Sequence, residues 1–250
     1  MEIIHFDYTF VIVLLIFLLG GIVKGTIGVG LPTVTLVLLS FIYDIKDSIS
    51  FILIPVIFTN LFQMLDGKEL KSILNQTKYF LITSLIFIVP GFFILRVVHS
   101  KIILLVLGGL LILNSSLVLL KKIIIFKNYH SFKVQFIIGA LNGMTTGITS
   151  IYTMPFVFLM QSLNFNKEKL IQLMGLTFFL YSLFQFILFY SFSMIDQRVL
   201  LFSSVACVPI LLGVVAGKYL RKVLSEQTFK ILFNYMLLLS GLVIVIKNIF

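Results

Sequence analysis

The sequence is poor in the residues on which disulfides and metal clusters depend. Cys207 is the single cysteine among 250 residues, which excludes an intrachain disulfide and leaves no cysteine cluster for a metal. The three histidines, His5, His99 and His130, lie near segment boundaries without the spacing of metal ligands. We therefore expect no cofactor and no metal site.

Charged residues are also scarce. They make up 11% of the chain, against roughly 25% in a typical soluble domain. Tryptophan is absent, so tyrosine alone must supply any polar aromatic belt at a membrane surface. A soluble protein of this size would lack the polar groups needed to cover its surface.

The few acidic residues argue against catalysis and against a buried proton or sodium relay. All nine lie in predicted links or at segment ends: Glu2, Asp7, Asp44, Asp47, Asp66, Glu69, Glu168, Asp196 and Glu226. No Ser/His/Asp or Cys/His group can be assembled within the apolar segments. We therefore do not expect an enzyme.

Long hydrophobic runs dominate what is present. Hydrophobic residues form 60% of the chain, and runs such as 101–120 are long enough to cross a hydrocarbon layer about 30 Å thick. The pattern predicts ten apolar segments joined by short links: 8–23, 29–42, 48–65, 79–96, 101–120, 133–147, 150–162, 169–191, 198–217 and 229–247. We expect an all-α integral protein of the plasma (inner) membrane, whose first segment is retained and is not a signal peptide.

The basic residues indicate membrane topology rather than nucleic acid binding. The net charge of +10 lies in short links and forms no stripe or tail. If all ten segments are counted, 13 of the 19 basic residues lie on one side, five lie on the other, and Lys24 lies within the membrane. This imbalance predicts that both termini lie outside. The short segments are able to span or to re-enter, so eight to ten transmembrane or re-entrant segments are expected.

The chain also repeats itself. Gly21 and Gly25 are matched by Gly139 and Gly143 at an offset of 118 residues, and Asn60-Leu61-Phe62-Gln63 is matched by Ser182-Leu183-Phe184-Gln185 at an offset of 122. Two homologous halves are implied, 1–125 and 126–250. With five segments in each half, the second half enters the membrane from the opposite side, which is an inverted repeat typical of alternating-access transporters.

Each half contains a Gly-Pro break, from Lys24 to Pro32 and from Asn142 to Pro155. Glycine and proline interrupt helices and free backbone N–H groups, and these attract anions at helix starts. The alternative is that the small residues only let helices pack closely. The predicted contacts to a small anionic solute are Lys24, Gly25, Thr26, Gly28, Gly30, Pro32, Asn60, Gln63, Asn142, Gly143, Thr145, Thr146, Gly147, Thr149, Ser150, Pro155 and Gln185.

Lys24 is the most informative of these residues. A base in an apolar run usually faces a pathway, although a lysine at a helix end also has the option of snorkelling to the surface. Gln63 and Gln185 are matched in the two halves. Asn114 and Tyr181 are expected to hold helices together.

The motifs resemble the TauE/SafE family of sulfite and organosulfonate exporters. The resemblance rests on GGIVKGTIGVGLP, on its second copy GALNGMTTGITSIYTMP, and on the segments around Pro90-Gly91 and Pro209. It covers essentially the whole chain and implies a permease that moves sulfite or a related sulfur oxyanion or sulfonate out of the cell. The alternatives are an uptake permease for a small organic or inorganic anion, a channel, or a non-transporting membrane assembly protein. The oligomeric state stays open.

Overall fold

The computed structural model describes residues 8–223 and 226–249. In these residues the chain is all-helical, and ten helices follow the ten predicted segments. They are α1 (Tyr8–Ile27), α2 (Leu31–Leu39), α3 (Ile45–Leu65), α4 (Leu70–Val97), α5 (Ser100–Leu119), α6 (Phe132–Thr149), α7 (Phe156–Ser162), α8 (Lys167–Ser191), α9 (Gln197–Val223) and α10 (Glu226–Ile249). Among the described helices, seven are long and apolar enough to cross a membrane: α1, α3, α4, α5, α8, α9 and α10. The prediction of an all-α, multi-pass membrane protein is confirmed.

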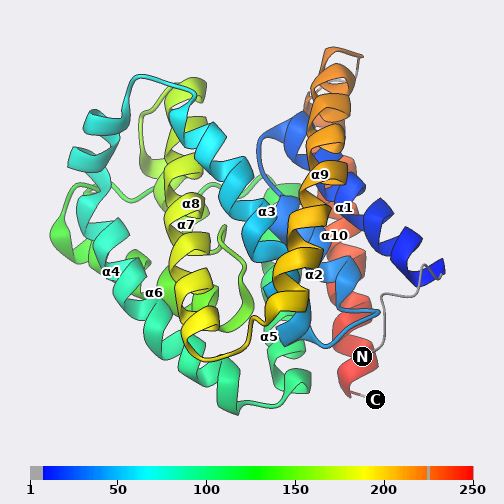
Figure 1. The fold of residues 1–250 in the computed structure, drawn as a ribbon. Coiled ribbons are helices and arrows are strands. Elements are labelled where there is room, and N and C mark those ends of the chain that lie inside the picture. Colours follow the sequence, from blue (N-terminus) through cyan, green and yellow to red (C-terminus); the bar gives the residue numbers. More distant parts are fainter. Residues whose placement is uncertain (1–7, 224–225, 250) are drawn as a thin grey trace.

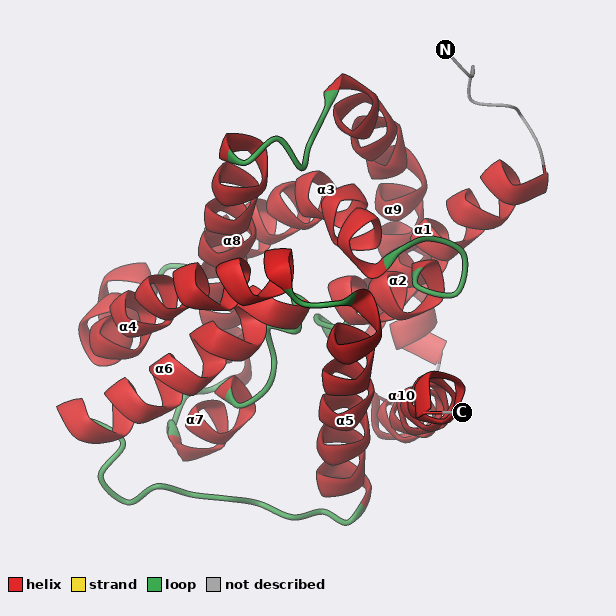
Figure 2. Cartoon of the chain, turned by 90° about the horizontal axis from the view of Figure 1, so that it is seen from below, coloured by secondary structure: helices red, strands yellow, loops and turns green. Residues whose placement is uncertain are grey.

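The helices pack in pairs around a central pair. Helices α3 and α8 pack against each other between two flanks, with α4 and α6 on one flank and α1 and α9 on the other (Figure 1). Helix α10 packs against α5. The long connection after α5 runs along the edge of the molecule to α6 (Figure 2).

Contacts between loops define two ends of the bundle. At the end that we call the basic end, Lys169 of α8 pairs with Glu69 before α4 at 3.3 Å, and the Phe126 N–H donates to Ser162 at the end of α7. At the opposite end, Lys46 of α3 donates to the carbonyl of Arg96 in α4. The same end holds Lys101 at the start of α5, Arg198 in a cavity with Tyr43, and Lys247 over the Phe41 ring.

The surface is apolar and the interior holds polar groups, as expected for a protein dissolved in lipid. Large side chains such as Leu15, Ile86 and Leu212 are half exposed or more. Buried polar residues include Asn60, Gln135, Asn142 and Gln185. Hydrogen bonds between buried polar groups of this kind contribute about 0.6 kcal/mol each in membrane proteins.

The two chain breaks are shorter than the sequence predicts. Helix α1 continues through Lys24 to Ile27, so the first break is confined to 28–30. Thr145, Thr146, Gly147 and Thr149 lie inside α6, and the second break covers 150–155. The prediction that the helix is interrupted from Asn142 onward is wrong, because the glycines of α6 lie against a neighbouring helix and do not interrupt their own.

Candidate functional site

The two breaks meet at a cavity of about 330 Å³, which we call the central cavity. The first break contributes Val29 and Gly30, and the second contributes Ile151 and Thr153. Residues of α1, α2, α5, α7, α8 and α10 complete the wall: Ile27, Thr33, Leu110, Leu111, Asn114, Val118, Val157, Met160, Met174, Lys230, Phe233, Asn234 and Leu237. Irregular backbone at membrane depth is tolerated only inside protein or along a wet cavity, and both breaks contribute to the wall of this one.

Left-handed glycines shape the first break. Gly28 has φ +83° and Gly30 has φ +96°, and these backbone values are strained for residues with a side chain. They turn the chain at the end of α1 so that α2 folds back along it, with Thr35 beside Gly20. Pro32 lies in the first turn of α2, where its missing N–H costs nothing.

The start of α2 lies at the wall of the central cavity, which Gly30 and Thr33 line. Gly30 caps α2 without a side-chain hydrogen bond. Among the described residues, the N–H groups of Leu31 and Thr33 have no hydrogen-bond partner. Such a helix start carries a partial positive charge and favours an anion.

Asn142 fixes the conformation of the second break through hydrogen bonds from its side chain. Its Oδ1 accepts from the Phe156 N–H at 2.8 Å, which fixes the start of α7. Its Nδ2 donates to the Tyr181 hydroxyl at 3.1 Å. The extended stretch between α6 and α7 then brings Thr153 to the wall of the central cavity.

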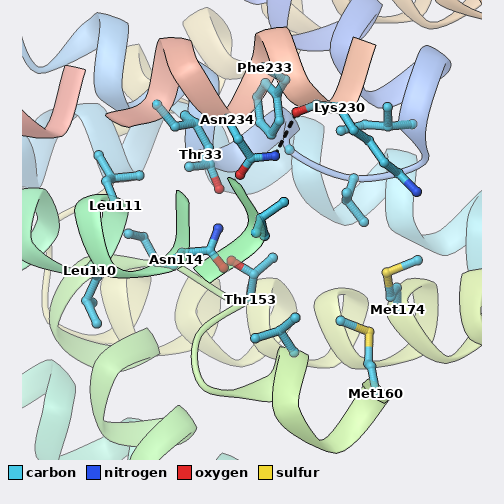
Figure 3. Close-up of a pocket in the computed structure, with 17 residues that line it drawn as sticks. Thr33, Leu110, Leu111, Asn114, Thr153, Met160, Met174, Lys230, Phe233 and Asn234 are labelled. Carbon is cyan, nitrogen blue, oxygen red and sulfur yellow. Dashed lines mark hydrogen bonds between the residues drawn. The ribbon is translucent and has the colours of Figure 1, made fainter. Parts of the chain in front are cut away.

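Two amides complete the polar lining. Asn234 is buried, its Nδ2 donates to the Lys230 carbonyl, and its Oδ1 has no partner in the described residues. Asn114 is half buried on α5. The polar ends of Asn234, Asn114, Thr33 and Thr153 are turned toward a shared space (Figure 3). An unpartnered buried amide oxygen costs about 1–3 kcal/mol, and a water or a solute with a hydroxyl group, donating to this oxygen, would recover the free energy.

The chemistry of the cavity suits a small anion with an apolar part or a hydroxyl group. Backbone N–H groups, amides and hydroxyls supply donors, while Leu111, Phe233 and Met174 supply apolar wall. Exposed Lys230 adds a positive charge to the lining. In the described residues, no group of three or more His, Cys, Asp or Glu side chains is placed to hold a metal ion.

The residues predicted from the first half divide between two places. Gly30 lines the central cavity. Lys24, Gly25, Gly28 and Gln63 line a second cavity at the basic end. Asn60 lies beside this second cavity and accepts a hydrogen bond from the Lys24 ammonium group. Thr26 lines neither cavity, and its hydroxyl donates to the Ile22 and Gly217 carbonyls.

The polar residues predicted from the second half form a buried network. The Gln185 Nε2 donates to the Thr146 carbonyl and to the Ser150 hydroxyl, both at 2.9 Å. Its Oε1 accepts from the Tyr152 hydroxyl, also at 2.9 Å. Thr145 and Thr149 donate to the Met154 and Thr145 carbonyls respectively. These groups hold the second break in shape and do not line the central cavity.

Three of the predicted glycines are close-packing positions. A Cβ atom on Gly25 would lie 2.2 Å from the Val214 carbonyl oxygen, and one on Gly143 would lie 2.2 Å from the Ser84 carbonyl oxygen. Gly147 meets the Ile88 carbonyl and Gly91 in the same way. Pro155 stands directly before α7. For these glycines the alternative stated in the sequence analysis holds: they allow neighbouring helices to pack closely.

Five polar residues of the central cavity are not among the predicted contacts: Thr33, Asn114, Thr153, Lys230 and Asn234. Asn114 was identifiable as a polar residue in an apolar run, but the sequence favoured a packing role for it. Asn234 lies one helical turn after Lys230, and this spacing places both on one side of α10. That spacing is the signal that the sequence offered.

The family model for the sulfite exporter TauE/SafE matches residues 13–244. No curated protein and no solved structure matches the chain. The matched segment includes both breaks and every residue of the central cavity, and the family consists of membrane transporters rather than enzymes. The chain therefore belongs to the TauE/SafE sulfite exporter family.

Proposed function

We propose that the protein is a permease that moves sulfite, or a related sulfur oxyanion or sulfonate, out of the cell through the central cavity. The observation that carries the proposal is the meeting of both breaks at one cavity, with free N–H groups at the start of α2. A cytoplasm held negative drives one negative charge outward with about 2.3 kcal/mol per 100 mV. Export of an anion then needs no coupling ion.

The two halves are proposed to form an inverted repeat. The packing of α1 on α9 and of α6 on α4 uses matching glycines: Gly25 meets Gly217, and Gly147 meets Gly91. Helix α1 ends with left-handed Gly28 donating to the Lys24 carbonyl, and α6 ends with left-handed Ser150 donating to the Thr146 carbonyl. These contacts favour an offset of 122 residues for the breaks. The offset of 118 taken from the glycines in the sequence is one helical turn away.

The basic end is proposed to face the cytoplasm of a plasma (inner) membrane. Thirteen of the 19 basic residues belong to this end, as positively charged cytoplasmic loops require. Tyr8 and Ile249, the first and last described residues, then lie toward the outside.

Saturable flux tests the proposal. Proteoliposomes containing the wild-type protein are expected to take up labelled sulfite with a half-saturation constant, and an unlabelled small sulfonate is expected to compete. Asn114→Leu is expected to lower this flux at least tenfold without loss of folded protein. Flux that rises linearly with concentration would indicate a channel, and no flux of any sulfur anion from folded protein would refute the proposed function.

A further inference from the structure

A second cavity, of about 230 Å³, lies at the basic end beside the last turn of α1. We call it the basic pocket. Its wall includes Lys24 and Gly28 from the first break region, Gln63 and Asp66 from the end of α3, and Lys218 and Arg221 from α9. Three basic side chains and one carboxylate line it, so that the net formal charge of the wall is +2.

Lys24 is the buried cation of this pocket. It is 7% exposed, and its ammonium group donates to Asn60 Oδ1. The amide of Asn60 is held in turn by the Val56 carbonyl, which accepts from Nδ2 at 2.8 Å. The hydrogen-bond partner of Lys24 is thus a neutral amide. An ammonium group has three N–H donors, and the bond to Asn60 uses one of them.

No carboxylate in the described residues forms an ion pair with Lys24. A buried charge without a counter-charge is costly, and it is generally paired, hydrated or placed on a pathway. Asp66, the one acid of the pocket wall, is exposed and does not reach Lys24. An anion in the pocket would supply the missing charge.

The first break separates the basic pocket from the central cavity. Gly28 lines the basic pocket, whereas Val29 and Gly30 line the central cavity. The Gly28 N–H donates to the Lys24 carbonyl at 2.8 Å, which fixes the start of this wall. A side chain at Gly28 would meet nothing within 4 Å, so the pocket is open on that side.

Among the described residues, the matching contact between α6 and α4 holds no buried cation such as Lys24. At the offset of 122 residues that the breaks favour, Thr146 takes the place of Lys24, whereas Lys218 and Arg221 correspond to Arg96 and His99 at the opposite end. The corresponding interior is closed by the hydrogen bonds from Gln185 to Thr146 and Ser150. The buried cation is therefore a particular feature of the basic end and does not follow from the repeated fold.

We propose that the basic pocket is a second anion-binding site, in which Lys24, Lys218 and Arg221 hold a small oxyanion at the basic end before it passes the first break into the central cavity. The ligand class rests on the proposed function. The pocket raises the local concentration of anions at the basic end.

Equilibrium binding of radiolabelled sulfite to the purified protein tests this site. We expect two sulfite ions per wild-type chain and one per chain of Lys218→Gln. Lys218 is exposed and its replacement does not disturb the buried contacts. The matched control is Lys222→Gln, whose charge lies over the Tyr219 ring outside the pocket, and it is expected to bind two.

Flux loaded from the basic end gives a second readout. Lys218→Gln is expected to raise the half-saturation concentration for sulfite about fivefold while the maximal rate changes less than twofold, which a purely structural role would not produce. A single bound sulfite in a wild-type protein that transports, or equal behaviour of Lys218→Gln and Lys222→Gln, would overturn the second site and leave the proposed function standing. If the folded wild-type protein neither binds nor transports sulfite, sulfate or a small sulfonate, both proposals are wrong.

Discussion

Asn234 is the residue at which stability and function are expected to separate. Its buried Oδ1 has no partner in the described residues, and such a group costs about 1–3 kcal/mol. Asn234→Leu removes this cost and is expected to keep or raise the melting temperature while lowering sulfite flux at least tenfold. Thermal unfolding and proteoliposome flux measure the two effects.

Asn248→Leu is the matched control on the same helix. Asn248 makes the same kind of bond, from Nδ2 to the carbonyl four residues earlier, but it lies outside the central cavity. Its flux should stay near that of the wild type. Equal loss of flux in both variants would show that the amide of Asn234 acts only through the structure of α10.

The sequence identified polar residues in apolar runs, but it did not reveal which of them remain available to a solute. Gln63 and Gln185 occupy matching positions in the sequence, yet Gln185 makes three buried hydrogen bonds, whereas Gln63 bonds to the Ile171 carbonyl and lines the basic pocket. The two glutamines differ in their hydrogen bonds because the neighbouring breaks differ in sequence. The second break offers the side chains of Ser150 and Tyr152 to Gln185, whereas the first break has Gly28 and Gly30 at the matching positions. Contacts of this kind between distant segments leave no periodic pattern in a single sequence.

At the scale of the elements, the glycines of α6 are expected to fix how closely it approaches α4. A Cβ atom at Gly143 would lie 2.2 Å from the Ser84 carbonyl oxygen, and backbone atoms cannot move aside cheaply. Gly143→Ala should therefore destabilise the protein by about 1–3 kcal/mol. The yield of monodisperse protein and its melting temperature would report the loss.

Gly109→Ala is the control for this substitution. Gly109 lies within α5, and a Cβ atom there would meet nothing within 4 Å. Because alanine favours a helix over glycine by about 1 kcal/mol, this variant is expected to be as stable as the wild type or more so. If Gly143→Ala unfolds at the same temperature as Gly109→Ala, close approach at Gly143 does not hold α6 against α4.

The ten segments were predictable because hydropathy marks them directly. The positions of the breaks were less predictable. The segment 145–149 contains glycine and β-branched residues, which disfavour a helix, but it remains part of α6. Tertiary contacts decide the position of the break, since Ser150 takes a left-handed conformation where Gln185 bonds to it. Local propensity is a weak guide where packing overrides it.

At the scale of the whole molecule, the charge imbalance predicts which end faces the cytoplasm. In a background in which Ser replaces Cys207, a cysteine at Lys127 in the long connection before α6 should be protected from an impermeant thiol reagent in intact cells. A cysteine at Lys101, at the start of α5, should be labelled. Both positions are exposed, so access to the side chain itself is equal. The reverse pattern would invert the proposed orientation.

Sulfite flux under an imposed membrane potential tests the central claim most directly. Vesicles loaded with labelled sulfite at equal concentrations inside and outside are given a potential of either sign. If the protein is an anion permease, net sulfite moves toward the positive side and reverses with the potential, and Asn114→Leu abolishes the movement. Net movement that ignores the potential, or flux that persists undiminished in Asn114→Leu, would contradict electrogenic anion transport through the central cavity.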